Sequence, residues 1–85
     1  RVTTSDLNRI LVSATERRQP PIISRGRLKL FYATQTAARP PTISLFVNRE
    51  DVPTDYTRFL ERCFRENLPL GGTPLRLRYR RRESH

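Results

Sequence analysis

The stretch YATQTAARPPTISLFVN, residues 32–48, decides the fold of this chain. Two short runs of alternating apolar residues flank a turn at Arg39-Pro40-Pro41. Proline presets its own φ, donates no backbone hydrogen bond and pushes the residue before it toward extended geometry. The stretch therefore predicts two neighbouring strands joined by a stiff connection.

A first helix is predicted ahead of this hairpin. Residues 7–14 place apolar side chains at i, i+3, i+4 and i+7, which is the spacing of one helix face. Thr3 or Thr4 can cap the start of the helix, and Gln19-Pro20-Pro21 ends it. A loop then leads into the first strand, at about residues 27–34.

A second helix and a last strand are predicted after the hairpin. The apolar stripe of residues 56–64 favours a helix that Thr54 or Asp55 caps. Residues 75–80 alternate apolar side chains with arginine, which is typical of a strand with one buried face. The order α-β-β-α-β predicts an α+β fold in which two helices pack on one face of a three-stranded sheet. We expect one domain, residues 1–85, with a disordered tail at about 82–85.

Charge is the most unusual property of the composition. Seventeen Lys+Arg oppose eight Asp+Glu, which gives a net charge of +9, and every cation except Lys29 is arginine. Arginine presents a planar fork that suits phosphate, and it stacks on flat groups. The excess favours a polyanionic partner, most simply a nucleic acid. A soluble basic domain from an arginine-rich proteome is the plainer alternative.

Enzymatic, metal and membrane functions find little support in the sequence. Cys63 is the only cysteine and His85 the only histidine, so a structural zinc site lacks ligands and a reducing compartment, the cytoplasm, is expected. The chain contains no apolar run of about 20 residues, the length of a membrane span. No P-loop pattern surrounds the single lysine. Cys63 falls on an apolar helix stripe, where a core residue is expected. We predict no catalytic residue, metal ligand or cofactor for this chain.

Strand alternation predicts where the cations gather. The last strand carries arginines on one face, and the first strand carries Arg27 and Lys29 on the parity of Phe31, opposite Tyr32. With the helices on the leucine face, the other face holds these cations together with Phe31 and Phe46. Cations interleaved with aromatic rings can bind phosphates and stack on bases. The candidates for RNA contact are Arg25, Arg27, Lys29, Arg76, Arg78, Arg80, Arg81 and Arg82.

Two other interpretations of that face stay open. Long arginine stems can cover the two phenylalanine rings on a surface that binds only solvent. An exposed apolar cluster can instead dock another domain. The docking candidates are Phe31, Arg39, Pro40, Pro41 and Phe46.

Five segments taken together resemble the C-terminal KH-like domain of the bacterial double GTPases Der/EngA. They are YATQ, RPPT and LFVN of the hairpin, YTRFLERCFRE of the second helix and GTPLRLRYR at the last strand. The Leu7-Asn8 pair and Pro20-Pro21 belong to the same likeness, which covers about residues 7–82. Typical KH domains clamp nucleic acid with a GXXG loop, and the three glycines of this chain do not have that spacing.

The resemblance implies a parent protein and a role. In this family two GTP-binding domains precede the KH-like domain, and the parent acts in ribosome biogenesis, in maturation of the large subunit. The chain is accordingly expected to be a C-terminal fragment of a bacterial GTPase that binds GTP and Mg elsewhere. The implied function is a non-catalytic module that binds ribosomal RNA or the large ribosomal subunit and docks onto the GTP-binding domains of the same polypeptide according to their nucleotide state. The alternative is a purely structural interdomain module with no RNA contact.

Overall fold

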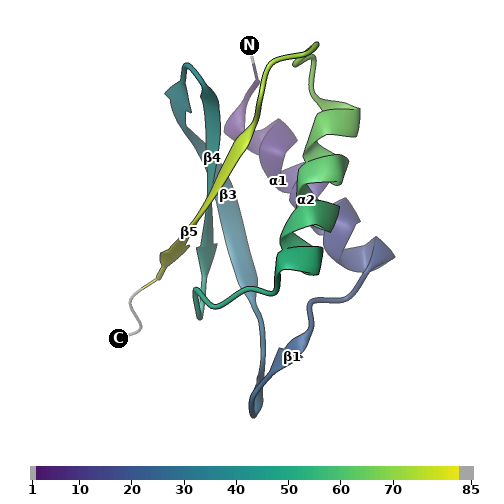
Figure 1. Ribbon diagram of the computed structural model, residues 1–85, viewed down its shortest axis with the longest axis vertical. Coiled ribbons are helices and arrows are strands. Elements are labelled where there is room, and N and C mark those ends of the chain that lie inside the picture. The colour runs from purple at the N-terminus through teal and green to yellow at the C-terminus, as the bar shows by residue number, and fades with distance from the viewer. Residues whose placement is uncertain (1, 83–85) are drawn as a thin grey trace.

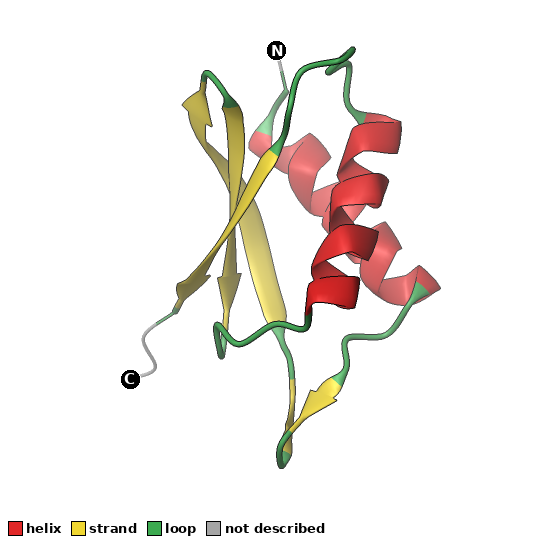
Figure 2. Cartoon of the chain, viewed as in Figure 1, coloured by secondary structure: helices red, strands yellow, loops and turns green. Residues whose placement is uncertain are grey.

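The computed structural model describes residues 2–82, in which a layer of helices covers one sheet (Figure 1). Both long helices lie against the same face of that sheet (Figure 2). The predicted α+β class is confirmed, and a small β-ribbon is added to the predicted order. The elements are α1 (Thr4–Arg17), β1 (Ile22–Ile23), β2 (Gly26–Arg27), β3 (Leu30–Ala38), β4 (Pro41–Val47), α2 (Thr54–Asn67) and β5 (Arg76–Arg81).

The main sheet has the strand order β3-β4-β5, so β4 is its central strand. β3 runs antiparallel to β4, whereas β5 runs parallel to it. Parallel neighbours need a long crossover, and α2 provides it. Arg39 and Pro40, joined by a cis peptide bond, form the connection between β3 and β4, where the proline pair predicted a turn.

The prediction for β3 was wrong in its bounds and in the face that it gave to Tyr32. The strand spans Leu30–Ala38 rather than residues 27–34, and its pairing with β4 slips immediately before Tyr32. A β-bulge adds one residue to a strand, so the side chains beyond it exchange faces relative to those before it. Phe31 is the extra residue, and Tyr32 consequently pairs with Phe46 instead of facing the core.

The β-ribbon of β1 and β2 was not predicted. These two strands pair antiparallel around the connection Ser24-Arg25, in which Ser24 has a φ of 55°. The β4–α2 loop holds the ribbon in place. Arg49 donates from Nη1 to the carbonyl of Ile23 at 2.8 Å, and Asn48 donates from Nδ2 to the carbonyl of Arg27 at 3.0 Å. The ribbon projects from the end of the main sheet (Figure 1).

The helix starts follow the sequence at α1 but not at α2. Thr3 Oγ1 accepts the backbone N–H of Asp6 at 3.1 Å, which confirms a threonine cap. The N-cap of α2 is Pro53, and no side chain caps this helix. The prediction of Thr54 or Asp55 as its cap was therefore wrong. The carbonyl of Pro53 accepts the backbone N–H groups of Tyr56 and Thr57 at the start of α2, each at 3.1 Å.

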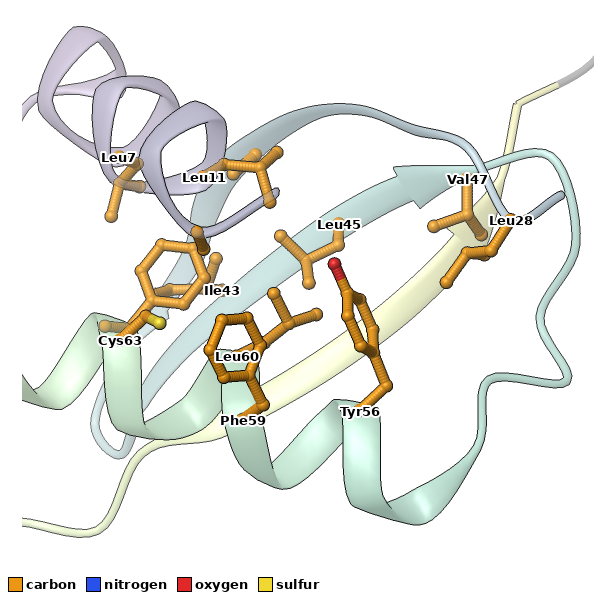
Figure 3. Packing of buried hydrophobic residues seen from close by; sticks show 13 residues of the cluster. Leu7, Leu11, Leu28, Ile43, Leu45, Val47, Tyr56, Phe59, Leu60 and Cys63 are labelled. Atoms are coloured by element: carbon orange, nitrogen blue, oxygen red, sulfur yellow. The ribbon is translucent and has the colours of Figure 1, made fainter. Parts of the chain in front are cut away.

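The core fills the space between the two helices and the sheet (Figure 3). Aromatic side chains of α2 pack against aliphatic side chains of β4 and α1. Cys63 is 2% exposed and belongs to this core, as predicted. The buried apolar residues are Leu7, Leu11, Ala14, Leu28, Ala33, Ile43, Leu45, Val47, Tyr56, Phe59, Leu60, Cys63 and Phe64.

Candidate nucleic-acid interface

The sheet face turned away from the helices carries a regular pattern of side chains, and we call it the outer face. Residues that pair across neighbouring strands point to the same side of a sheet. One row across the three strands therefore joins Tyr32, Phe46 and Arg80. The outer face consists of Tyr32, Thr34, Ala37, Thr42, Ser44, Phe46, Arg76, Arg78 and Arg80.

The cations of the outer face all come from β5. Arg76, Arg78 and Arg80 lie on this face and are exposed, whereas Leu77 and Tyr79 between them pack against the core. The alternation predicted this placement correctly. Alternate residues of a strand repeat about every 6.6 Å, so the three arginines form a row roughly 13 Å long. Within residues 2–82, none of the three forms an ion pair with a carboxylate.

Three aromatic rings lie beside the β5 arginines, where β4 and β5 end. We call Phe31, Tyr32 and Phe46 the aromatic patch. The rings of Tyr32 and Phe46 stack, with centroids 4.5 Å apart and planes inclined by 13°. The guanidinium of Arg82 lies over the ring of Phe31, with its central carbon 3.7 Å from the centroid. Phe31 is 36% exposed and Tyr32 40% exposed. Flat apolar rings and planar cations are thus presented to solvent together.

Hydroxyl side chains occupy the centre of the outer face, and their hydrogen bonds are made within the domain. Ser44 is fully buried and its Oγ lies 3.0 Å from Oγ1 of Thr36. Thr42 donates from Oγ1 to the carbonyl of Pro40 at 2.9 Å. The groups left to meet a partner on this face are therefore the arginines and the aromatic patch.

Two of the predicted cations lie elsewhere, because the strand to which they were assigned begins only after them. Arg27 belongs to β2, and its guanidinium donates to the carbonyl of Pro20. Lys29 lies between β2 and β3, and its backbone N–H donates to Asn48 Oδ1 at 2.8 Å. Arg25 is exposed at the ribbon connection. Arg27 and Lys29 therefore lie outside the strands of the main sheet, whereas the prediction had both on its first strand, and Arg25 and Arg27 belong to the ribbon.

The last two arginines of the described chain continue the sheet. Arg81 pairs with Val47 and so points to the side of the core, at the exposed end of β5. Arg82 donates its backbone N–H to the carbonyl of Val47 at 2.9 Å. The disordered tail was expected at about residues 82–85; Arg82 is hydrogen-bonded to β4, and residues 83–85 lie outside the described residues.

The docking candidates do not form one patch. Arg39, Pro40 and Pro41 lie at the turn of the β3–β4 hairpin, whereas Phe31 and Phe46 lie at its opposite end. Phe46 follows Pro41 by five positions along the extended strand β4, a distance of roughly 17 Å. A docking partner that uses the aromatic patch therefore meets β5 arginines before it meets the proline turn.

Other arginines are already engaged within the domain, unlike those of β5. The guanidinium of Arg18 lies 2.6 Å from Asp55, and this hydrogen bond holds the pKa of that carboxyl below its usual value. Arg49 binds both carboxylate oxygens of Asp51, at 2.9 and 3.1 Å, and lowers the pKa of Asp51 in the same way. These two arginines stabilise the fold through their ion pairs, and the paired carboxylates partly neutralise their charge.

Two titratable groups of the core, Cys63 and Tyr56, are buried and pack with the apolar side chains around them. Burial raises the pKa of the Cys63 thiol, and it raises the pKa of Tyr56 to about 12. Tyr56 donates from its hydroxyl to the carbonyl of Arg18 at 2.9 Å, which ties α2 to the end of α1. Both groups are neutral near pH 7. Residues 2–82 contain no group of three histidine, cysteine or acidic side chains that could hold a metal ion.

Over the same described range, neither helix is long and apolar enough to cross a membrane.

Tyr32 is the outer-face residue that the sequence interpretation missed. A bulge of one residue has no signal in the hydrophobic alternation, because residues on both sides of Phe31 keep their own period of two. The anchoring roles of Asn48 and Arg49 were also missed. Both residues lie between the second strand of the hairpin and the second helix, where the sequence has no periodic pattern from which a contact could be read.

Comparisons with known proteins agree with the fold. A family model described as KH-domain-like of EngA bacterial GTPase enzymes, C-terminal, matches residues 1–80. The chain is 45% identical over 85 residues to the GTPase Der of Geotalea uraniireducens, which covers 99% of this chain and 19% of that protein. It is 50% identical over 82 residues to the GTPase Der of Acaryochloris marina, which covers 94% of this chain and 18% of that protein. The chain thus spans about a fifth of the length of these relatives.

Proposed function

Since the chain belongs to the family of KH-like C-terminal domains of the EngA bacterial GTPases, we propose that it is a non-catalytic RNA-binding module of a ribosome-assembly GTPase. It binds phosphates of ribosomal RNA, within the large ribosomal subunit, through its outer face. It also docks onto the GTP-binding domains of the same polypeptide. One observation carries the proposal: β5 presents a row of exposed arginines that no described carboxylate neutralises, beside an exposed aromatic patch.

The guanidinium groups of the β5 arginines suit a polyanionic partner. Each guanidinium offers a rigid fork of donors that matches a phosphate. Arg76, Arg78 and Arg80 recur along one strand, so a chain of phosphates laid along β5 meets a cation at each step. The twofold excess of cations over carboxylates in the whole chain favours the same partner at long range.

Control by nucleotide state requires a difference in contacts between two states of the parent protein. RNA and a GTP-binding domain would compete for the outer face, because one surface cannot hold both at once. In one nucleotide state a GTP-binding domain covers the aromatic patch, and in the other state the face is open to RNA. GTP itself is bound and hydrolysed outside this chain, so GTP turnover by the isolated 85 residues would contradict the proposal.

Salt dependence of RNA binding tests the phosphate contacts. The measurement is the anisotropy of a labelled 20-nucleotide single strand titrated with the chain at several salt concentrations. Each phosphate contact contributes a slope of about −0.7 to log K against log salt, so three contacts predict a slope of roughly −2. Arg78→Gln should flatten the slope by about 0.7. Affinity without salt dependence would overturn the phosphate-contact proposal.

Arg62→Gln is the matched control for that experiment. It removes the same charge from an exposed position of α2, in the helix layer away from the outer face. The proposal expects no change in the slope for this variant. Equal effects of Arg62→Gln and Arg78→Gln would mean that net charge alone attracts RNA and that the outer face is not the site.

A purely structural interdomain module is the second candidate, and the exposure of Phe31 and Tyr32 favours it. In that case the outer face is permanently covered by the GTP-binding domains. Arg76→Glu and Arg78→Glu would then expose the interdomain linkers of the longer polypeptide to limited proteolysis while leaving its affinity for ribosomal precursors unchanged. The RNA-binding proposal expects the reverse result for affinity.

A further inference from the structure

We infer that the aromatic patch and Arg82 form a base-stacking site for unpaired nucleotides, on the outer face of the sheet. The inference rests on the proposed function and adds to it the class of RNA and the contact that selects it. Such a site is separate from the glycine-loop clamp of typical KH domains, for which this chain has no matching glycine spacing.

The position of Tyr32 leaves one side of its ring open. Phe46, on the central strand, stacks on the other side at 4.5 Å. β3 is an edge strand of the main sheet, so no side chain from a further strand covers Tyr32 from outside. Its exposure of 40% agrees with this arrangement. A base that stacks on Tyr32 extends an aromatic pile that already contains two rings.

Arg82 and Phe31 provide a second flat platform. The central carbon of the guanidinium lies 3.7 Å from the ring centroid, within the range of cation–π attraction. A guanidinium held in this way keeps a second face for a base and its N–H edge for a phosphate. The Arg82 backbone is tied to β4 by its hydrogen bond to Val47, which limits how far this platform can move.

The chemistry around the patch selects an anion with flat faces. Arg80 shares the row of Tyr32 and Phe46, and Arg82 covers Phe31. No residue of the outer face carries a carboxylate. An apolar protein surface would bury these guanidinium groups without partners, which is costly. A nucleotide offers a base for the rings and a phosphate for the cations, so RNA fits the surface better than an apolar protein surface does.

Stacking distinguishes unpaired RNA from duplex RNA. Bases in a duplex are already stacked on one another, so their faces are covered. Base–aromatic stacking strengthens binding by about tenfold per base. The chain should therefore bind a single strand about tenfold more tightly than a duplex with the same number of phosphates, at equal salt concentration.

The experiment compares two probes and three variants of the 85-residue chain. The probes are a fluorescein-labelled 24-nucleotide RNA without self-complementarity and a blunt 12-base-pair RNA duplex, which has the same number of nucleotides, both followed by anisotropy. Tyr32→Leu keeps the apolar volume but removes the ring, and Arg82→Lys keeps the charge but removes the plane. Val12→Ser is the control, because Val12 is 55% exposed on α1 in the helix layer.

We expect Tyr32→Leu to weaken binding of the single strand about tenfold and to leave the duplex within twofold. Arg82→Lys should also weaken the single strand more than the duplex, and Val12→Ser should change neither. Upfield shifts of base protons in NMR spectra of the complex would report the ring contact directly. Arg82 lies past the end of β5, so its variant tests the inference even if Tyr32→Leu fails to fold, which far-UV circular dichroism shows.

The contrary outcomes separate the two proposals. If neither probe binds, the proposed function is overturned and the stacking site with it. If both probes bind equally and the variants affect them alike, the stacking site is overturned while RNA binding stands. If the variants leave both affinities unchanged but loosen the packing of the GTP-binding domains in the longer polypeptide, the patch is a protein interface and the inference is wrong.

Discussion

The side-chain amide of Asn8 forms two hydrogen bonds with the backbone of Ala33. Its Oδ1 accepts the N–H of Ala33 at 2.8 Å, and its Nδ2 donates to the carbonyl of Ala33 at 2.9 Å. Ala33 lies on β3, an edge strand. Asn8 thus supplies from α1 the donor and the acceptor that a further strand would supply. It also closes this part of the edge to pairing with another chain.

Asn8→Ala should lower the free energy of unfolding by about 2 kcal/mol, because the backbone N–H and the carbonyl of Ala33 each lose a hydrogen-bond partner. Urea denaturation followed by far-UV circular dichroism measures the change. Asn67→Ala is the control, since Asn67 donates only to the carbonyl of Cys63 at the end of α2. An equal cost for the two variants would show that Asn8 does not stabilise the edge strand.

Asn48→Ala should loosen the segment between the ribbon and β3. Asn48 Oδ1 accepts the N–H of Lys29 at 2.8 Å, and its Nδ2 donates to the carbonyl of Arg27. Loss of a hydrogen bond of about 1 kcal/mol predicts exchange of the Lys29 amide hydrogen roughly five to ten times faster. Hydrogen exchange measured by NMR checks this, with the Leu45 amide in the central strand as the internal reference. Unchanged exchange at Lys29 would count against the anchoring role of Asn48.

Stability should fall in alkali through ionisation of Tyr56. Burial raises the pKa of Tyr56 to about 12 in the folded chain, whereas the pKa in the unfolded chain is about 10. Below pH 10 the phenol is neutral in both states and its contribution is complete. Between about pH 10 and 12 the unfolded state releases the proton first, so the free energy of unfolding falls, by an amount of the order of 2 kcal/mol.

Tyr56→Phe tests that assignment. The variant loses the hydrogen bond to the Arg18 carbonyl, so it should be less stable by about 1 kcal/mol at pH 8. Between about pH 9 and 11.5 the free energy of unfolding of this variant should fall less steeply than that of the unsubstituted chain. The remaining fall comes from Tyr79, because burial raises the pKa of Tyr79 as well. Urea denaturation across this pH range gives both values. Parallel pH profiles would exclude Tyr56 as the titrating group.

Cys63 should resist thiol reagents in the folded chain. Its side chain is 2% exposed, and burial raises the pKa of the thiol, so little thiolate forms at pH 8. The expected result is slow reaction with a chromogenic disulfide in buffer and complete reaction within seconds in concentrated urea. Rapid modification in buffer alone would mean that α2 separates readily from the core.

The sequence predicted the residues of the outer face correctly only where a strand pairs without a bulge. β5 contains no bulge, so alternation alone placed Arg76, Arg78 and Arg80 together. β3 contains a bulge at Phe31, and the same rule therefore put Tyr32 on the wrong side. Bulges depend on how a strand twists against its neighbours, which a pattern within one strand does not contain.

The ribbon and the start of α2 were missed for a different reason. β1 and β2 have two residues each, too few for any period to show. Their position is held by hydrogen bonds from Asn48 and Arg49, about twenty residues away along the chain. The start of α2 relies on the carbonyl of Pro53, so the side-chain capping rule pointed to the wrong residues.

The central position of β4 couples occupancy of the outer face to folding. Tyr32 and Arg80 lie on opposite neighbours of β4, far apart along the chain, and they share a row only in the assembled sheet. A ligand that contacts both residues binds the folded chain and not the unfolded chain. By mass action it adds about 2.7 kcal/mol to the free energy of unfolding when its concentration is a hundred times the dissociation constant. The thermal midpoint of this domain is therefore itself a gauge of whether its outer face is filled.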